Sequence, residues 1–141
     1  MKFHLLPAAA FVALLLFQVA TACAEDAAGF RSPSKNIACQ YFAEGKSGTI
    51  RCDIANMASR AKRPADCDLE WGDAFEIATT SGSGARICHG DTVMDPSLPV
   101  LAYGSAWERG GLSCKSEPSG VTCRNAARHG FTLSRTAQSL F

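Results

Sequence analysis

The 141-residue chain has almost no net charge, because 14 Lys and Arg stand against 13 Asp and Glu. Loss of an N-terminal leader containing Lys2 would leave 14 − 1 = 13 basic residues against 13 acidic ones. Proteins that bind nucleic acid or anionic membrane surfaces usually carry an excess of Lys and Arg. The composition therefore argues against both kinds of partner.

The chain also lacks an apolar run long enough for a transmembrane helix, which needs roughly 20 residues. Its leading apolar run, "AAAFVALLLF" at residues 8–17, has ten. Ala22-Cys23-Ala24 follows with the small-x-small pattern of a signal-peptidase site. We predict a signal peptide at residues 1–24 and a single exported domain at 25–141, with its core at about 30–141. Alternatively, "ATAC" resembles a lipobox with Ala20 in place of the usual Leu, and Cys23 would then carry a lipid anchor.

No cysteines have the close C-x₂₋₄-C spacing of zinc sites or the C-x-x-C spacing of thiol redox centres. Without Cys23, six of the seven cysteines remain. An even number in a short exported chain indicates a disulfide framework. We therefore expect no metal site and no cofactor.

No segment shows a convincing helical period, although residues 55–63 could form a short helix or a basic loop. Short apolar segments separated by Gly, Pro, Ser and Asn predict an all-β fold, a small disulfide-stapled antiparallel sandwich or barrel built from hairpins. The predicted strands are residues 36–42, 49–54, 74–79, 85–89, 100–103, 111–114, 121–124 and 131–134.

Two predicted hairpins place cysteines at similar distances on either side of a turn, "AEGKSG" in one and "EPSG" in the other. Opposed residues in an antiparallel pair lie close enough for a disulfide. The remaining two cysteines pair by elimination across the turn "TTSGSGA". The predicted bridges are Cys39–Cys52, Cys114–Cys123 and Cys67–Cys88.

Candidates for catalysis are few, since only His89 and His129 follow the leader. His89 and Asp91 could serve a small hydrolase, but no serine lies in a G-x-S-x-G nucleophile elbow. We predict that His89 ends a hairpin and that Asp91 bonds into the following turn, with no catalytic residue in the chain.

The acidic stretch "DCDLEWGDAFE" could hold calcium, but it departs from an EF-hand loop: Gly72 comes one residue late and Ile77 stands where the bidentate Glu belongs. The preceding basic residues predict mutual neutralisation at the surface instead.

Trp107 lies in the charged segment "SAWERGG", which predicts an exposed loop tip. An exposed Trp can anchor a protein partner or stack on a sugar ring. With the loop "CHGDTVMDPSLP", it forms the expected contact surface. The predicted function is a non-catalytic binding or envelope-associated module whose partner is a protein or glycan of the cell envelope.

Several blocks occur in one order and spacing along the chain, among them "FRSPSKNIACQY", "CDLEWGD", "CHGDTVMDPSLPVLAYG", "LSCKSEPSGVTCRN" and "HGFTLSR". In these blocks the chain resembles a bacterial family of small exported proteins known as a domain of unknown function. The resemblance implies an exported domain and supplies no activity, substrate or catalytic residue.

A shorter segment, "TTSGSGAR", is similar to the S-x-S-G-A-R motif of periplasmic and lipid-anchored inhibitors of c-type lysozyme. This likeness implies roles for Ser81, Ser83 and Arg86 in a loop inserted into the enzyme. The inhibitors place an aromatic residue after the arginine and carry a second, Lys-containing motif. Here Ile87 follows, and the second motif is absent.

Overall fold

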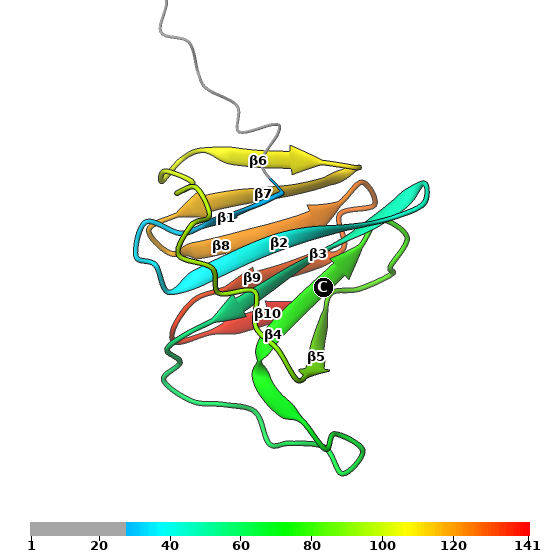
Figure 1. Cartoon of the computed structure of the whole chain (residues 1–141), viewed down its shortest axis with the longest axis vertical. Coiled ribbons are helices and arrows are strands. Elements are labelled where there is room, and N and C mark those ends of the chain that lie inside the picture. The colour runs from blue at the N-terminus through cyan, green and yellow to red at the C-terminus, as the bar shows by residue number, and fades with distance from the viewer. Residues whose placement is uncertain (1–27) are drawn as a thin grey trace, which may run out of the picture.

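A computed structural model describes residues 28–141 as two five-stranded antiparallel sheets that pack face to face (Figure 1). The N-terminal sheet has the strand order β1 (Gly29–Arg31), β2 (Ile37–Glu44), β3 (Ser47–Ile54), β4 (Glu70–Ala78) and β5 (Ala85–His89). The C-terminal sheet has the order β10 (Gln138–Leu140), β9 (Gly130–Leu133), β8 (Gly120–Asn125), β7 (Leu112–Glu117) and β6 (Ala106–Arg109). The all-β prediction is confirmed as a sandwich, and the sheets do not close into a barrel.

The two predicted hairpins join β2 to β3 and β7 to β8. In the first, Glu44 pairs with Ser47 around a turn whose Gly45 has a φ of 58°, a conformation that glycine adopts without a steric penalty. In the second, Glu117 pairs with Gly120 around Pro118 and Ser119. Both turns lie where the sequence places them.

The three disulfides have the predicted partners. Cys39 lies directly opposite Cys52 in the β2–β3 pair, and Cys114 lies opposite Cys123 in the β7–β8 pair, each with a Cα–Cα distance of 4.0 Å. The Cys67–Cys88 bridge ties the loop before β4 to the edge strand β5. Cys23 and the predicted signal peptide lie outside the described residues.

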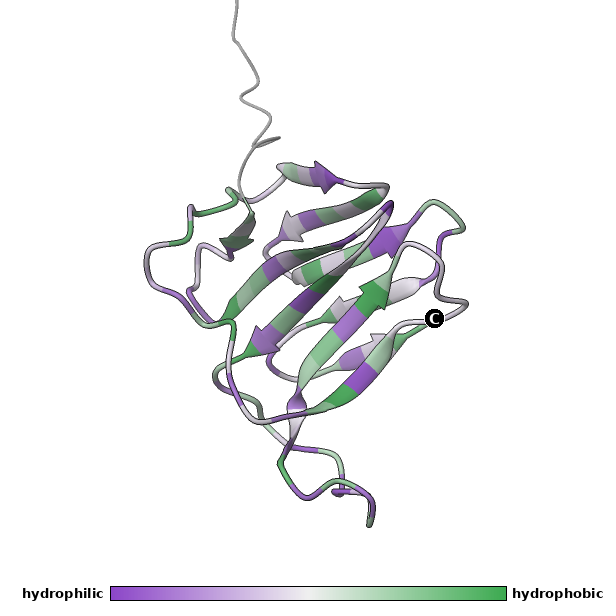
Figure 2. Ribbon diagram, turned by 45° about the vertical axis from the view of Figure 1, so that its right-hand side comes forward, coloured by the Kyte–Doolittle hydropathy of each residue, from purple (hydrophilic) through white to green (hydrophobic). Residues whose placement is uncertain are grey.

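The core forms between the sheets because alternate side chains of each strand point inward. On β3 the inward set is Ile50, Cys52 and Ile54, and on β8 it includes Val121 and Cys123. Figure 2 shows the alternation as green and purple bands along the strands. Aromatic side chains from the two sheets pack against each other in this core. The ring centroids of Phe75 and Phe131 are 6.3 Å apart, and those of Phe30 and Trp107 are 5.9 Å apart.

The predicted strand at residues 100–103 is wrong. Val100 makes only an isolated bridge to Arg31, and the first strand of the C-terminal sheet is β6, a few residues later. The short edge strands β1 and β10 have three residues each, too few to show an alternation in the sequence. Residues 55–63 form a loop and not a helix.

The expected exposure of Trp107 is also wrong. Its side chain is 0% exposed, and it packs against Phe30 and Tyr41 at ring distances of 5.9 and 6.1 Å. The charges of its neighbours do not predict the exposure of Trp107, because adjacent side chains of a strand point to opposite faces. Glu108 points outward and Trp107 points into the core, so Trp107 cannot anchor a partner in this fold.

Candidate functional site

The connection between the sheets covers part of the outer face of the N-terminal sheet. We call residues 90–99 the strap. The Val93 carbonyl accepts a hydrogen bond from Gln40 on β2, and the Leu98 carbonyl accepts one from Arg31 on β1. The strap therefore runs from β5 at one edge of this sheet to β1 at the other before the chain continues to β6 (Figure 1).

Under the strap, Arg51 and Asp53 point outward from β3 and are nevertheless buried. The Arg51 guanidinium donates to both Asp53 oxygens at 2.9 and 3.0 Å. Asp53 also accepts from the Thr92 hydroxyl at 2.9 Å and from the Val93 amide at 3.0 Å. A buried charge is tolerated when it is paired and fully hydrogen-bonded, as here.

Asp91 completes this charged group from the strap. Its carboxylate and its carbonyl oxygen each accept a hydrogen bond from Arg51 at 2.8 Å. The hydrogen bond from Arg51 and its charge lower the pKa of Asp91. Burial alone would lower the pKa of Arg51, but its bonds to Asp53 and Asp91 outweigh burial and raise that pKa.

His89 extends the group toward the edge of the sheet. Its Nδ1 lies 2.6 Å from the carbonyl oxygen of Asp91, and its Nε2 lies 2.8 Å from a carboxylate oxygen of Asp73. Burial would lower the pKa of His89, but the bonds to Asp73 and Asp91 outweigh it and raise the pKa. Both partners are acceptors, so they favour the imidazolium form with a proton on each nitrogen.

Asp73 is held in turn by a second cation, because Arg60 from the loop before β4 contacts its other oxygen at 3.0 Å. Burial would raise the pKa of Asp73, but the hydrogen bond from His89 and the charge of Arg60 outweigh this effect and lower the pKa. Asp73 belongs to the acidic stretch weighed for calcium, and its carboxylate is committed to these two side chains.

The predicted pair His89 and Asp91 is thus close in space, and both side chains make their hydrogen bonds within the protein. The Asp91 carboxylate bonds Arg51 and not the imidazole, and both nitrogens of His89 are already hydrogen-bonded. A general base needs a nitrogen that can take a proton from a substrate. In the described residues, this group fastens the strap to the sheet.

The loop between β4 and β5 is also fastened. The Asn125 amide donates to the Ala78 and Ser81 carbonyls, and the Ser83 hydroxyl donates to the Gly84 carbonyl. The Arg86 guanidinium stacks over the Phe75 ring at 5.0 Å. Arg86 therefore lies along the side of the core and does not project from the loop tip.

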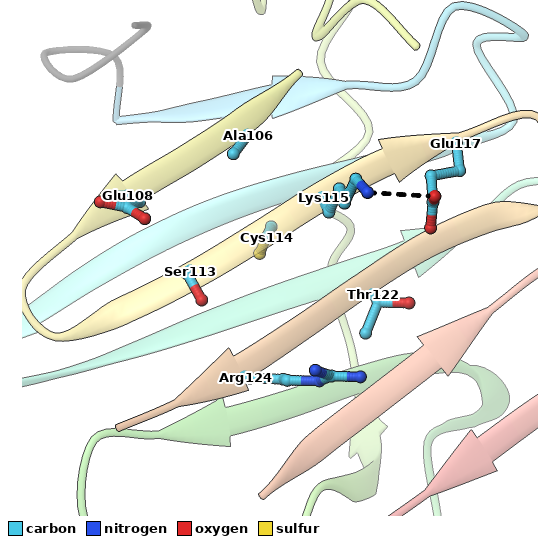
Figure 3. A pocket seen from close by; sticks show the side chains of 8 residues that line it. All are labelled: Ala106, Glu108, Ser113, Cys114, Lys115, Glu117, Thr122 and Arg124. Atoms are coloured by element: carbon cyan, nitrogen blue, oxygen red, sulfur yellow. Dashed lines mark ion pairs between the residues drawn. The ribbon is translucent and has the colours of Figure 1, made fainter. Parts of the chain in front are cut away.

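Within residues 28–141, the strap lies on the other sheet, and the outer face of the C-terminal sheet is hollowed (Figure 3). Short side chains of Ala106, Ser113 and Thr122 form the floor of this open hollow, which has a volume of about 400 Å³. Longer charged side chains stand around them, Glu108 from β6, Lys115 and Glu117 from β7, and Arg124 from β8. Figure 3 shows this arrangement with the Lys115–Glu117 ion pair of 3.3 Å.

Neither the Arg51–Asp53 pair nor the hollow was predicted, although the alternation of side chains along the strands is visible in the sequence. If Cys52 points inward, its neighbours Arg51 and Asp53 must share the outer face of the same strand. By the same rule, Ser113 and Lys115 flank the inward Cys114 and must face outward together. What the sequence could not supply is the path of the strap, which decides which outer face is covered.

A family model matches residues 10–141, and it describes a family of unknown function, DUF6636. The chain belongs to this family. No curated protein and no solved structure matches the chain.

Three disulfides suggest an oxidising, extracytoplasmic location. Within residues 28–141, the structure has no helix long and apolar enough to cross a membrane.

Proposed function

We propose that this protein is a non-catalytic binding module of the cell envelope, secreted or periplasmic, with attachment through a lipidated Cys23 as the alternative form. The observation that carries the proposal is the open, hollowed face of the C-terminal sheet, which stands on a disulfide-stapled scaffold. Rigid elements hold binding groups in place with little loss of entropy on association.

The chemistry of the hollow favours a ligand with both an amino and a carboxyl group. Glu108 makes no ion pair within the described residues, and the Arg124 guanidinium stacks over the Phe141 ring at 5.5 Å without a carboxylate partner among them. Opposite charges on one surface recognise a dipolar ligand by electrostatic complementarity. Peptide-bearing fragments of the bacterial cell wall have this character and are our candidate ligand class.

Isothermal titration with soluble muropeptides tests this surface, with neutral chitooligosaccharides as the comparison ligand. Ser113→Arg fills the floor of the hollow from an outward position and is expected to weaken muropeptide binding at least about tenfold. Ser139→Arg, on β10 of the same sheet face but outside the hollow, is the matched control and should bind like the wild type. Equal affinity of all three proteins would contradict the proposed site.

Inhibition of c-type lysozyme through Ser81, Ser83 and Arg86 receives less support. Such an inhibitor must offer its arginine to the enzyme, whereas Arg86 here stacks on Phe75. A small hydrolase based on His89 and Asp91 is likewise disfavoured, because the hydrogen bonds of both side chains are used to fasten the strap.

A further inference from the structure

The two hairpin disulfides meet in the centre of the sandwich. The Cys39–Cys52 bridge points inward from β2 and β3, and the Cys114–Cys123 bridge points inward from β7 and β8. All four side chains are buried. The Sγ atoms of Cys52 and Cys123 are 3.8 Å apart, so two sulfurs of different bridges are in contact across the interface between the sheets.

Only some of the cysteines take part in this contact. Sγ atoms of Cys39, Cys52 and Cys123 lie within 4.8 Å of one another, and Cys114 stands outside that group. Cys52 and Cys123 are thus the inner pair, one from each sheet. The Cys67–Cys88 bridge lies at the edge strand β5, where Cys88 is exposed, and has no place in this arrangement.

We propose that the two hairpin bridges form one exchangeable unit, in which reductive opening of either bridge leads to a new Cys52–Cys123 bridge between the sheets. Exchange proceeds when a thiolate attacks a disulfide sulfur within reach, and a neighbouring bridge at contact distance satisfies this requirement. The Cys67–Cys88 bridge would remain outside the exchange.

The chemical steps balance with one external dithiol. The dithiol reduces Cys39–Cys52 to two thiols and is itself oxidised to a disulfide. The Cys52 thiolate then attacks the Cys123 sulfur, a Cys52–Cys123 bond forms, and the Cys114–Cys123 bond breaks. The electron pair leaves on the Cys114 sulfur, which takes up the proton lost from Cys52. Two electrons and two protons have been added in total, and Cys39 and Cys114 end as thiols.

Under reducing conditions, the protein would therefore replace disulfides within hairpins by a disulfide between the two sheets. Each original bridge closes a single hairpin, whereas Cys52–Cys123 would join the two layers directly through residues separated by 71 positions. A covalent link between the layers would keep the sandwich assembled when both hairpin bridges have been lost.

The direct experiment removes the two outer cysteines from the full-length exported protein. In Cys39→Ala/Cys114→Ala, non-reducing peptide mapping should find a Cys52–Cys123 cross-link in most molecules. The matched control, Cys52→Ala/Cys123→Ala, leaves the outer pair and should contain Cys39 and Cys114 as thiols that react with iodoacetamide after denaturation. Equal cross-linking in both variants, or thiols at Cys52 and Cys123 in the folded first variant, overturns the proposal.

A measurement on the wild type covers the case in which the variants fail to fold. Limited reduction with dithiothreitol followed by acid quenching stops exchange, since the attacking thiolate is protonated. Species that have lost one core bridge should yield the peptide joining Cys52 to Cys123. Recovery of the original hairpin bridge alone in those species contradicts the exchange.

Discussion

The outer faces of the two sheets carry similar charged residues that differ in their exposure to solvent. On the N-terminal sheet, Arg51 and Asp53 are buried under the strap and paired with each other. On the C-terminal sheet, Glu108 and Arg124 are exposed around the hollow. Arg51 and Asp53 are thus bound to each other and to the strap, whereas Glu108 and Arg124 are exposed to solvent.

This difference follows from chain connectivity more than from composition. The chain must pass from β5, at one edge of the N-terminal sheet, to β6 in the other layer, and it does so across the outer face of the N-terminal sheet. Buried charges need hydrogen-bonding partners. Where the strap buries Arg51 and Asp53, these partners are the two side chains themselves and residues of the strap. Within residues 28–141, the outer face of the C-terminal sheet is under no such demand, and it is the face that we propose for recognition.

The largest expected effect is at the covered face. Asp53→Ala removes one of the two carboxylates bound to Arg51 and also the acceptor of the Val93 amide, so the buried guanidinium keeps Asp91 as its remaining counter-charge. Loss of one partner of a buried ion pair costs about 3–5 kcal/mol. The free energy of unfolding from denaturant titration measures this loss.

The open face supplies the control for that measurement. Glu108→Ala changes an exposed carboxylate without an ion-pair partner in the described residues and should alter the free energy of unfolding by no more than about 0.5 kcal/mol. Equal destabilisation of Asp53→Ala and Glu108→Ala would contradict the view that charged residues stabilise the fold on the outer face of the N-terminal sheet and not on that of the C-terminal sheet.

A smaller effect is expected from pH through His89 and Asp73. The raised pKa of His89 gives a stabilisation that is complete below its unfolded value of about 6.5 and is lost as the pH rises through the folded pKa. The lowered pKa of Asp73 gives a stabilisation present above about pH 3.9 and lost as the pH falls through the folded pKa. The pair therefore stabilises the fold most between about pH 4 and 6.5.

The measurement compares unfolding free energies of the wild type and His89→Gln from pH 5 to pH 9. The wild type should lose stability toward the alkaline end, and the variant should show a flatter profile because glutamine does not titrate. Parallel profiles for the two proteins would mean that His89 does not hold the strap as its protonated form.

The smallest stability effect is expected at the ion pair of the open face. Lys115 and Glu117 are more than 40% exposed in their side chains, and exposed pairs contribute about 0–1 kcal/mol. Glu117→Gln should therefore leave the unfolding free energy nearly unchanged while altering muropeptide affinity and its salt dependence. A change in the unfolding free energy without any change in muropeptide affinity would show that Glu117 has a structural role and does not contact the ligand.

No effect is expected on c-type lysozyme, because Arg86 is held against Phe75. The rate of cell lysis by lysozyme should be undiminished at an excess of the purified protein. Inhibition that disappears in Arg86→Ala but persists in Arg109→Ala would restore the inhibitor interpretation.

Much of the fold could be predicted from the sequence, because hairpin turns are local. Gly45 and the Pro118–Ser119 turn fix two registers, and these place the cysteines opposite each other. The third bridge followed by elimination. The short edge strands β1 and β10 were not predicted, because three residues show no alternation and these strands are defined by their pairing with β2 and β9.

The candidate site was less predictable, because it depends on which face a distant segment covers. Trp107 was assigned by the charge of its neighbours, whereas the alternation along β6 places it in the core. His89 ends β5 as predicted, but the prediction that Asp91 bonds into the following turn is wrong, because its carboxylate bonds Arg51, 40 residues away. Local patterns do not reveal such contacts.

The most direct test of the account is a nuclear magnetic resonance titration of the isotope-labelled protein with soluble muropeptides. We predict chemical-shift changes at the amides of Glu108, Ser113, Thr122 and Arg124, with the strap at residues 90–99 unaffected. Changes confined to the strap, or saturating concentrations without any change on β6, β7 and β8, would contradict the assignment of recognition to the open face.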